Sequence, residues 1–433
     1  MTIQKKFLIL ILLTVCSRGL FLALFPGLNY YNGISNGFLH VADNVLDGRG
    51  LTTYVDLAPL NDSSHQWSYE PFIDRPLGYL AIVLLPYSLV RLPLSIQIFQ
   101  LVLSVCSVVL CYKVAERLFS EKTAFVASLL YSVWPLSARF EIALLGDSVV
   151  SLFLLISLWA FMKGLENRVI GTAFASGAAL GAGILMRSDL SFLPFFLLGV
   201  VYFVKRSSVA FRFLAPYLVG VFLVVGMQTA RNYTATNGSF LPLGLGKGIS
   251  MWEGISQFGD TLGTVYGDEK MTQREGYHSW AYPNGVERDQ KRFREALNII
   301  RAHPVWYGGI MARRVLVLLR PDGIILGRLM PAPSEFLERN PGSGMAGYLR
   351  EFWAPAACQV LLIILQISIL LLAARALVEA RDLSWLPGII ILYYVFIHIP
   401  TNAESRYFYP AIPVVLILAA RGYELIRKRS EAA

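Results

Sequence analysis

Charged residues and cysteines are both scarce in this 433-residue chain. Only 15% of the residues are charged and 55% are hydrophobic, a balance that excludes an ordinary soluble domain. The four cysteines all fall within long apolar runs. This placement argues against a disulfide framework or a cysteine-based zinc cluster, and we expect the thiols to be small apolar core residues.

Long apolar runs account for much of the chain, and several approach the roughly 20 residues that cross a bilayer core. The first run follows Lys5 and Lys6 and has no small-residue cleavage site after it, so we interpret it as an uncleaved span rather than a signal peptide. The sequence therefore predicts an all-α polytopic membrane protein. Its ten predicted spans are residues 7–26, 95–115, 122–138, 147–163, 169–187, 190–204, 210–230, 354–374, 384–399 and 408–425.

The basic residues predict the orientation of these spans, because short cytoplasmic loops are rich in Lys and Arg. Ten spans with both termini inside put every basic connector on the cytoplasmic side. The clusters are Lys5/Lys6, Lys113/Arg117/Lys122, Lys163/Arg168, Lys205/Arg206/Arg212, Arg375/Arg381 and residues 427–429.

Two further apolar segments are not counted as spans. Residues 77–92 would invert every downstream loop if they crossed the membrane, so we predict a short interfacial or re-entrant helix there. Residues 305–320 carry three arginines and fit an interfacial helix better than a span.

This topology divides the chain into three parts. Residues 1–230 form an N-terminal transmembrane module with a long first outer loop (27–94), residues 231–353 form a large extracytoplasmic loop, and residues 354–433 form the C-terminal transmembrane helices. Because the inner connectors are short, we expect chemistry or binding at the outer face. Within the large loop, residues 287–304 have an apolar stripe and predict an amphipathic helix at the membrane surface, or alternatively a helix that packs on the loop domain.

Polar groups collect near the predicted outer ends of the spans. Arg18 lies inside the first span, where a charge needs a partner or a function. Arginine binds phosphate through its planar donor fork, and a carboxylate can act as a base or hold a metal, so the set suits a reaction on a phosphorylated lipid. The other members are Asp74, Arg75, Glu141, Asp147, Arg187, Asp189, Arg231, Glu404 and Arg406.

Each of these groups also has a structural interpretation. Arg187 and Asp189 can simply pair with each other, and Asp147 can be a helix N-cap. Arg231 and Arg406 can be interfacial anchors. For three further groups a structural role is the expectation: Glu141, His278 and His303.

The stretch HVADNVLDGRG (40–50) leaves a question open. His40, Asp43 and Asp47 stand at i, i+3 and i+7, on one face of a helix. The pattern fits either a catalytic feature at the membrane surface or the solvated side of a short helix.

An ordered set of short stretches along most of the chain resembles a known family. They are Arg18, ADNVLDGRG (42–50), IDRPLGYL (73–80), LLGDSVVSLF (144–153), LMRSDLSFLP (185–194), ARNYTATNGSFLPLGLGKGISMWEG (230–254), the helix 287–304 and ESRYFYPAIP (404–413). In this order they resemble the GT-C superfamily of polyprenyl-phosphate-sugar-dependent glycosyltransferases, of the protein-mannosyltransferase and lipid A aminoarabinose-transferase type (glycosyltransferase family 39-like).

The resemblance implies a GT-C-like helix bundle in a bacterial inner membrane, with its active site on the outer, periplasmic face. Its implied activity is transfer of a sugar from a polyprenyl-phosphate donor to a lipid, glycan or protein acceptor, by a displacement that inverts the anomeric centre. Donor, acceptor and membrane lipids are then the partners, and nucleic acid is not. A flippase or transporter of lipid-linked sugars, and a non-catalytic lipid-binding relative, are the alternatives.

The resemblance also suggests roles for individual residues. Asp74 resembles the family's metal-binding carboxylate, which implies a divalent metal ion, and Arg75 resembles the cation for the donor phosphate. Asp147 resembles an acidic residue lining the cavity. Arg406, together with Tyr407, resembles the basic residue near the final outer loop.

The chain departs from the family at the catalytic base. The family's aspartate stands a few residues before the alanine that Ala42 matches, and the corresponding window here, NGISNG (32–37), has no carboxylate. Three residues are therefore candidates for the catalytic role: Asp43, Asp147 and Asp74. The predicted substrate-binding residues are Arg75, Arg187, Arg231, Arg406, Tyr407 and His40.

Overall fold

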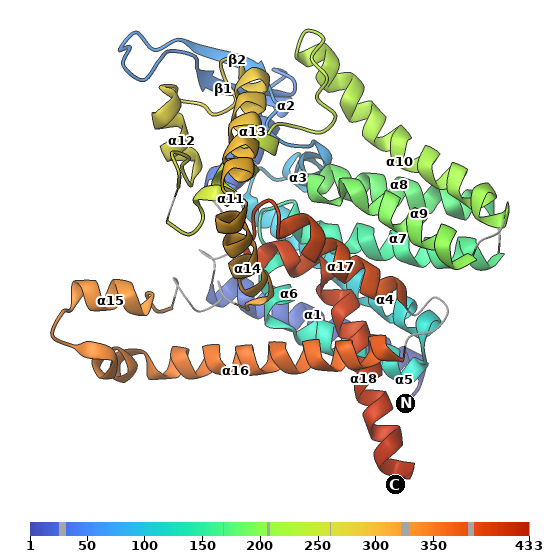
Figure 1. Cartoon of the computed structure of the whole chain (residues 1–433). Coiled ribbons are helices and arrows are strands. Elements are labelled where there is room, and N and C mark those ends of the chain that lie inside the picture. The colour runs from blue at the N-terminus through green and yellow to red at the C-terminus, as the bar shows by residue number, and fades with distance from the viewer. Residues whose placement is uncertain are drawn as a thin grey trace.

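The computed structural model describes residues 1–25, 32–167, 169–205, 208–259, 261–321, 329–379 and 385–432. Three basic residues used to predict the topology, Arg168, Arg206 and Arg381, lie outside the described residues. The described chain is almost entirely helical and contains one two-stranded sheet (Figure 1). The predicted all-α class is therefore confirmed.

Every predicted span corresponds to a helix. Six helices of the described chain are long and apolar enough to cross a membrane: α1 (Ile3–Leu24), α4 (Pro93–Leu118), α7 (Asp147–Asn167), α10 (Ser208–Ala235), α16 (Gly344–Val378) and α18 (Ile412–Ala432). The other predicted spans are shorter helices: α5 (Glu121–Val133), α8 (Ile170–Met186), α9 (Leu193–Lys205) and α17 (Leu386–His398). After Trp134, a short helix α6 (Pro135–Phe140) continues the path of α5.

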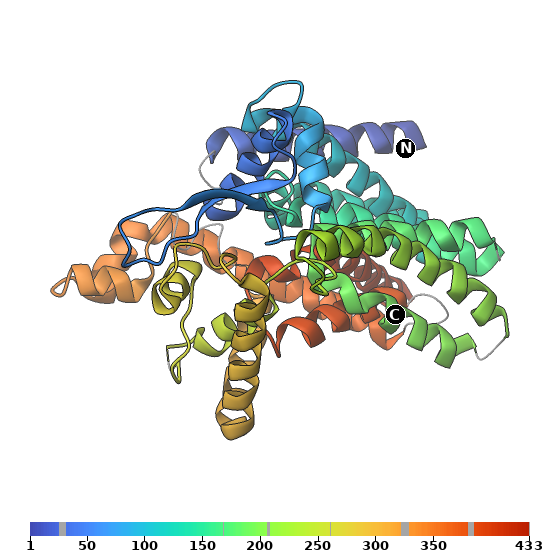
Figure 2. The same cartoon turned by 90° about the horizontal axis from the view of Figure 1, so that it is seen from above.

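Helix α7 lies at the centre of the bundle. Its neighbours are α4 and α8, and α8 in turn packs along α10 (Figures 1 and 2). Glycines allow the last pair to approach closely, because a Cβ on Gly177 would stand 1.8 Å from the Tyr217 carbonyl oxygen and one on Gly220 would stand 2.3 Å from the Phe174 carbonyl oxygen. Small residues at such contacts are the usual means of packing helices within a membrane.

The helix ends that carry the basic connectors lie together at one end of the bundle. Charged residues from different connectors form ion pairs there: Lys6 with Glu121 (2.6 Å), Arg117 with Glu166, and Arg429 with Glu379 (2.9 Å). The segments that the charge rule assigned to one side of the membrane are thus on one side of the molecule.

The predicted outer loops gather at the opposite end, on the left and upper side of Figure 1. The first loop contains α2 (Asn32–Leu46), strands β1 (Thr52–Asp56) and β2 (Trp67–Pro71), and α3 (Gly78–Tyr87). The strands are antiparallel, with Thr52 opposite Pro71. The large loop contains α11 (Lys247–Ser256), α12 (Asp268–Glu275), α13 (Gly285–Ala302), α14 (Pro304–Leu319) and α15 (Pro333–Arg339). Two short 3-10 helices, η2 (Ser188–Phe192) and η4 (Ser405–Ala411), complete this end.

The segments that were not counted as spans are short helices. Helix α3 has 10 residues and contains Pro86, so it reaches only about half of a bilayer core. Helix α14 has 16 residues, and its Arg314 is fully buried. The Arg314 guanidinium donates to the carbonyl oxygen of Ile399 (2.8 Å), which ties α14 to the end of α17.

Helix α13 buries its apolar stripe against protein. Phe293, Leu297, Ile299 and Ile300 pack on a cluster that includes Trp252 of α11. The structure therefore shows the alternative, a helix that packs on the loop domain, in place of the predicted membrane-surface helix.

Arg18 has the buried partner that its position in a span required. Its Nη2 lies 2.8 Å from Oε2 of Glu141, and the Tyr131 and Tyr409 hydroxyls donate to the other oxygen of the same carboxylate. This network ties α1 to α5, to the segment after α6 and to η4, which is the structural role expected for Glu141.

Candidate active site

Arg187 is the centre of a charged cluster at the outer end of the bundle. It follows the last residue of α8 and pairs with Asp147, the first residue of α7, and with Asp189 in η2 (2.8 Å). His398, at the end of α17, places its Nε2 3.0 Å from Asp189. The structure thus shows the pair of Arg187 with Asp189 that the structural interpretation expected, and it adds a second pair with Asp147 on α7. A carboxylate in the first turn of α7 is also favoured by the helix dipole.

The segment at η4 adds a second cation next to Arg187. The Arg406 Nε lies 2.7 Å from Glu404, the Tyr407 hydroxyl donates to Glu404 at 3.0 Å, and the Arg187 guanidinium lies over the Tyr407 ring, 4.8 Å from its centre. Burial tends to raise the pKa of Glu404, but Arg406 and the Tyr407 hydroxyl hold it below its usual value. Glu404 therefore carries a full negative charge at neutral pH.

Asp74 and Arg75, in the segment before α3, have far fewer partners. The Asp74 Oδ1 is covered yet has no hydrogen-bond partner among the described residues. Burial raises the pKa of Asp74 to about 6, against the opposing effect of Arg75. Arg75 is partly buried and forms no hydrogen bond or ion pair with the described chain. Gly244 packs against this segment, because a Cβ there would lie 3.0 Å from the Arg75 Cα.

Glu253 on α11 is a candidate site residue that sequence reasoning missed. Burial, followed by the charges of Asp268 and Glu404, raises its pKa to about 7. Asn402 donates to its Oε2 at 3.5 Å. The negative charge of Asp268, at the start of α12, also raises the pKa of Asp74, so one group influences both carboxyls.

A signal for Glu253 was present in the sequence. It stands in GISMWEGI (248–255), where Ile249, Trp252 and Ile255 are buried on the same helix, and an acid within an apolar stripe needs an explanation. Gly254 beside it brings α11 onto the chain after α17, since a Cβ on Gly254 would stand 1.8 Å from the Thr401 carbonyl oxygen.

The carboxylates of the HVADNVLDGRG stretch pair with Arg91, which belongs to none of these groups. On α2, His40 is exposed, and Arg91 pairs with Asp47 (2.9 Å) and, more loosely, with Asp43 (3.9 Å). The side chain of Asp43 is 38% exposed. This geometry is that of a solvated helix face.

Arg231, predicted to bind substrate, is engaged with the protein backbone. Its guanidinium donates to the carbonyl oxygens of Leu51 (3.0 Å) and Phe72. It thereby fixes the two ends of the β1–β2 hairpin to α10, and its anchoring contacts are to protein.

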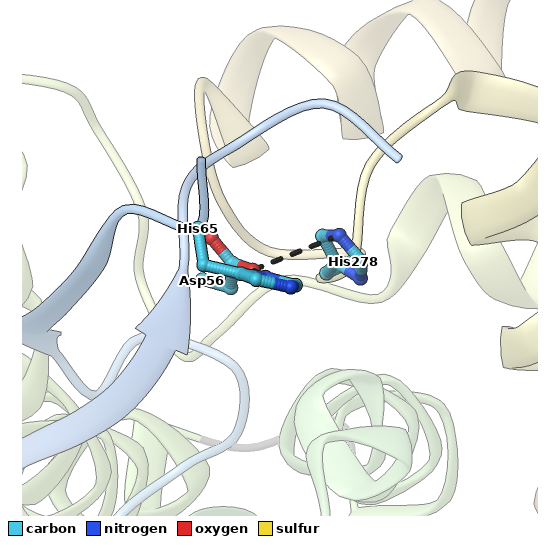
Figure 3. Close-up of side chains that lie close together, drawn as sticks. All are labelled: Asp56, His65 and His278. Carbon is cyan, nitrogen blue, oxygen red and sulfur yellow. Dashed lines mark hydrogen bonds and ion pairs between the residues drawn. The ribbon is translucent and has the colours of Figure 1, made fainter. Parts of the chain in front are cut away.

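A divalent metal at Asp74 requires further ligands around that carboxylate. Among the described residues, Asp74 does not belong to any group of three His, Cys, Asp or Glu ligands. The residues at Asp74 therefore do not fit a metal held by three such side chains. Elsewhere, Asp56, His65 and His278 do form such a group (Figure 3), although sequence reasoning treated His278 as an isolated loop histidine.

Comparison with known proteins agrees with the resemblance. A family model described as Dolichyl-phosphate-mannose-protein mannosyltransferase matches residues 74–229, which include Asp74, Arg75, Asp147 and Arg187. A search of curated proteins finds no match.

Solved structures of an oligosaccharyltransferase share the fold across nearly the whole chain. The apo oligosaccharyltransferase of Archaeoglobus fulgidus matches with a TM-score of 0.52 and 14% identity, over 99% of this chain and 52% of that one. The oligosaccharyltransferase AglB of Archaeoglobus fulgidus, in complex with an inhibitory peptide and a dolichol-phosphate, matches with a TM-score of 0.50 and 11% identity, over 99% and 52%. ArnT of Cupriavidus metallidurans bound to undecaprenyl phosphate gives a TM-score of 0.49 and 13% identity, over 98% and 61%.

The chain thus spans about half to three fifths of the length of these structures. The protein is an integral membrane protein with the fold of the GT-C superfamily of membrane glycosyltransferases, as the resemblance implied.

Proposed function

We propose that this protein is a membrane glycosyltransferase that moves a sugar from a polyprenyl-phosphate donor to an acceptor at the extracytoplasmic face. The observation that carries the proposal is that Arg75, which forms no hydrogen bond or ion pair among the described residues, stands next to Asp74, a carboxyl whose pKa is raised to about 6. Both stand within the segment that matches the mannosyltransferase family model. The dolichol-phosphate in the AglB complex supports a lipid phosphate as the donor's leaving group.

Arg75 and Arg406 are the groups that we assign to the donor phosphate. A phosphate that leaves the sugar gains negative charge, and preorganised cations stabilise that charge in the transition state. Arginine suits this role because its fork donates two parallel hydrogen bonds to phosphate oxygens. Arg187 and Tyr407 support the grip, since Arg187 lies over the Tyr407 ring beside Arg406.

Asp74 is the group that we assign to the acceptor's proton. An acid with a pKa of about 6 is mostly ionised at neutral pH and still basic enough to accept a proton. The acceptor hydroxyl gives its proton to Asp74, its oxygen bonds to the anomeric carbon, and the bond from that carbon to the phosphate oxygen breaks. Polyprenyl phosphate leaves with the electron pair, and one displacement inverts the anomeric centre.

Asp147 and Asp43 fit the same role less well. Asp147 is committed to Arg187, and Asp43 lies half-exposed on α2 beside Arg91. Glu253, with a pKa of about 7, is the second carboxyl able to hold a proton near neutral pH. We assign it to the acceptor side of the site, and Glu253→Gln distinguishes its contribution from that of Asp74. No step is assigned to a metal.

The decisive experiment measures transfer and binding separately. Purified protein in proteoliposomes is given radiolabelled polyprenyl-phosphate sugars and candidate acceptors, and binding of polyprenyl phosphate alone is measured in nanodiscs. Arg75→Ala should weaken phosphate binding by about 30-fold or more, because removing one partner of a desolvated charge pair costs about 2–5 kcal/mol. Arg75→Lys should restore only part of it.

Arg117→Ala, at the opposite end of the bundle, is the matched control and should behave as the wild type. Phosphate binding without transfer under every donor tested would identify a non-catalytic lipid-binding protein. Transbilayer movement of an unchanged donor would identify a flippase. Unchanged phosphate binding in both Arg75→Ala and Arg406→Ala would remove the assigned grip.

A further inference from the structure

Asp56, His65 and His278 meet where the two outer loops touch (Figure 3). Asp56 ends β1, His65 belongs to the connection between the strands, and His278 comes from the segment between α12 and α13. The Asp56 Oδ2 lies 2.6 Å from Nδ1 of His65 and 3.6 Å from Nε2 of His278. One potential ligand atom from each side chain lies within 4.8 Å of the other two.

The Asp56 carboxylate is fixed in the orientation that a metal ligand needs. Its Oδ1 accepts hydrogen bonds from the backbone N–H groups of Ala58 (3.0 Å) and Gln66 (2.8 Å), which leaves Oδ2 toward the two imidazoles. Outer hydrogen bonds of this kind orient the ligating atom of a metal site.

The two imidazoles are accessible and can adjust to an ion. The side chain of His65 is 54% exposed and that of His278 is 32% exposed, whereas Asp56 is buried. His65 has a positive φ of 37°, and this left-handed conformation occurs at the residue whose ring approaches Asp56. Zinc bonds of about 2.0–2.2 Å set tetrahedral ligands roughly 3.3 Å apart. The Asp56–His278 separation of 3.6 Å is near this value, and the exposed His65 ring, now 2.6 Å from Asp56, has to move away from it when an ion binds.

We propose that Asp56 Oδ2, His65 Nδ1 and His278 Nε2 bind a divalent transition-metal ion of the zinc class. Two imidazoles with one carboxylate favour zinc-like ions over Mg²⁺ and Ca²⁺, which prefer oxygen ligands. Water completes the coordination on the exposed side. The ion is structural, because the three ligands lie in the outer loops and Asp74 and Glu253 are not among them.

The ion joins the first outer loop to the large outer loop. A two-stranded hairpin is marginally stable by itself. The protein already ties this hairpin down by a hydrogen bond from the Leu60 N–H to the Gly276 carbonyl oxygen (2.9 Å) and by a bridge between Pro59 and Tyr277. A metal bound by His65 and His278 reinforces this contact, which holds the β1–β2 hairpin against the chain that leads into α13.

The test uses the full-length protein without a polyhistidine tag, in detergent, after chelator treatment. Zn²⁺ titrated by calorimetry should bind with one equivalent, and Mg²⁺ should not compete. Co²⁺ in place of Zn²⁺ should give visible absorption bands of a low-coordinate site with nitrogen ligands. Hydrogen exchange of residues 57–66 and 276–284 should slow when Zn²⁺ is added, which reports the cross-link independently of any activity.

Variants assign the site to these residues. His278→Ala should lose at least the roughly 10- to 100-fold in Zn²⁺ affinity that removal of an outer-shell partner alone costs. His303→Ala is the control, because this exposed histidine lies at the other end of α13 and should leave binding unchanged. Thermal unfolding without metal shows whether His278→Ala remains folded. Asp56→Asn is a second variant that should fold, because the asparagine oxygen can keep the backbone hydrogen bonds that Oδ1 accepts.

Stoichiometric Zn²⁺ binding that persists in both His278→Ala and Asp56→Asn would overturn the proposal. So would the absence of any binding to the wild type. Neither result affects the proposed sugar transfer, which depends on other residues.

Discussion

The two ends of the helix bundle both carry ion pairs, but they use them differently. At the basic end, Arg429 is 72% exposed where it pairs with Glu379, and Glu121 is 55% exposed where it pairs with Lys6. At the outer end, Arg187 is only 12% exposed. Exposed pairs are worth about 0–1 kcal/mol, whereas buried charges are costly to desolvate and often no more stabilising than apolar residues. Charge at the basic end therefore suits orientation in the membrane, and charge at the outer end suits a function that offsets its cost.

The largest expected effect is on cysteine labelling from outside the cell, which should either occur or not occur at each position. Cysteine introduced at Ser64 or Ser250, in the outer loops, should react with a membrane-impermeant reagent in intact cells. Cysteine at Ser430, near the basic end, should react only after the membrane is opened. The four native thiols lie in α1, α4 and α16 and define the background. Protection of Ser64→Cys or Ser250→Cys would place the charged cluster on the cytoplasmic side.

The next largest effect is expected at Asp74. Asp74→Asn should reduce transfer by about 10²–10⁴-fold while phosphate binding persists, because an amide cannot accept the acceptor's proton. The pKa of Asp74 is raised to about 6, and the base acts in its ionised form. Wild-type turnover should therefore fall about tenfold per pH unit below pH 6 and level off above it. A flat profile between pH 5 and 8 would assign the proton transfer to another group.

A smaller effect is expected on the free energy of unfolding, which should fall more when an ion pair is broken at the outer end of the bundle than at the basic end. Arg187→Ala leaves Asp147 and Asp189 without their shared cation and should cost about 3–5 kcal/mol, as removal of one partner of a buried pair does. Arg117→Ala breaks the pair with Glu166 at the basic end and should cost about 1 kcal/mol or less. Thermal unfolding in one detergent compares them directly. Equal losses of unfolding free energy in the two variants would contradict a difference between the two ends of the bundle.

The smallest effect is expected for Asp43→Asn. Asp43 is half-exposed and only loosely paired with Arg91, and an exposed pair is worth at most about 1 kcal/mol. Turnover should change by less than about fivefold. If Asp43→Asn instead abolishes transfer while Asp74→Asn is active, the base is on α2 after all.

The sequence predicts the helices well because crossing a bilayer requires long apolar runs. All ten predicted spans are helices, and the exclusion of residues 77–92 agrees with a ten-residue α3 that contains Pro86. Helix α13 shows the limit of periodicity, since an apolar stripe fits a lipid surface and a protein surface equally well. The stripe packs on α11, a helix about forty residues away in the chain.

The candidate site is harder to predict from the sequence, because loops bring its residues together from distant parts of the chain. Arg187 and Asp147 stand at helix ends, where the positions follow from the spans. Glu253 accepts a hydrogen bond from Asn402, and the His278 ring lies near that of His65, more than two hundred residues away. No local sequence pattern predicts contacts between residues so far apart in the chain. An acid within an apolar stripe, such as Glu253, and an isolated loop histidine, such as His278, can still be recognised as candidate site residues.

The absence of a side chain at Gly254 affects the pKa of the neighbouring Glu253. Because this residue has no side chain, α11 rests directly on the backbone at Thr401, and the neighbouring Glu253 is set against Glu404. The repulsion between Glu253 and Glu404 depends on the distance between their two segments. The contact at Gly254 sets how closely these segments approach, so it also influences the proton affinity of Glu253. A methyl group introduced by Gly254→Ala would push the two segments apart and weaken that repulsion.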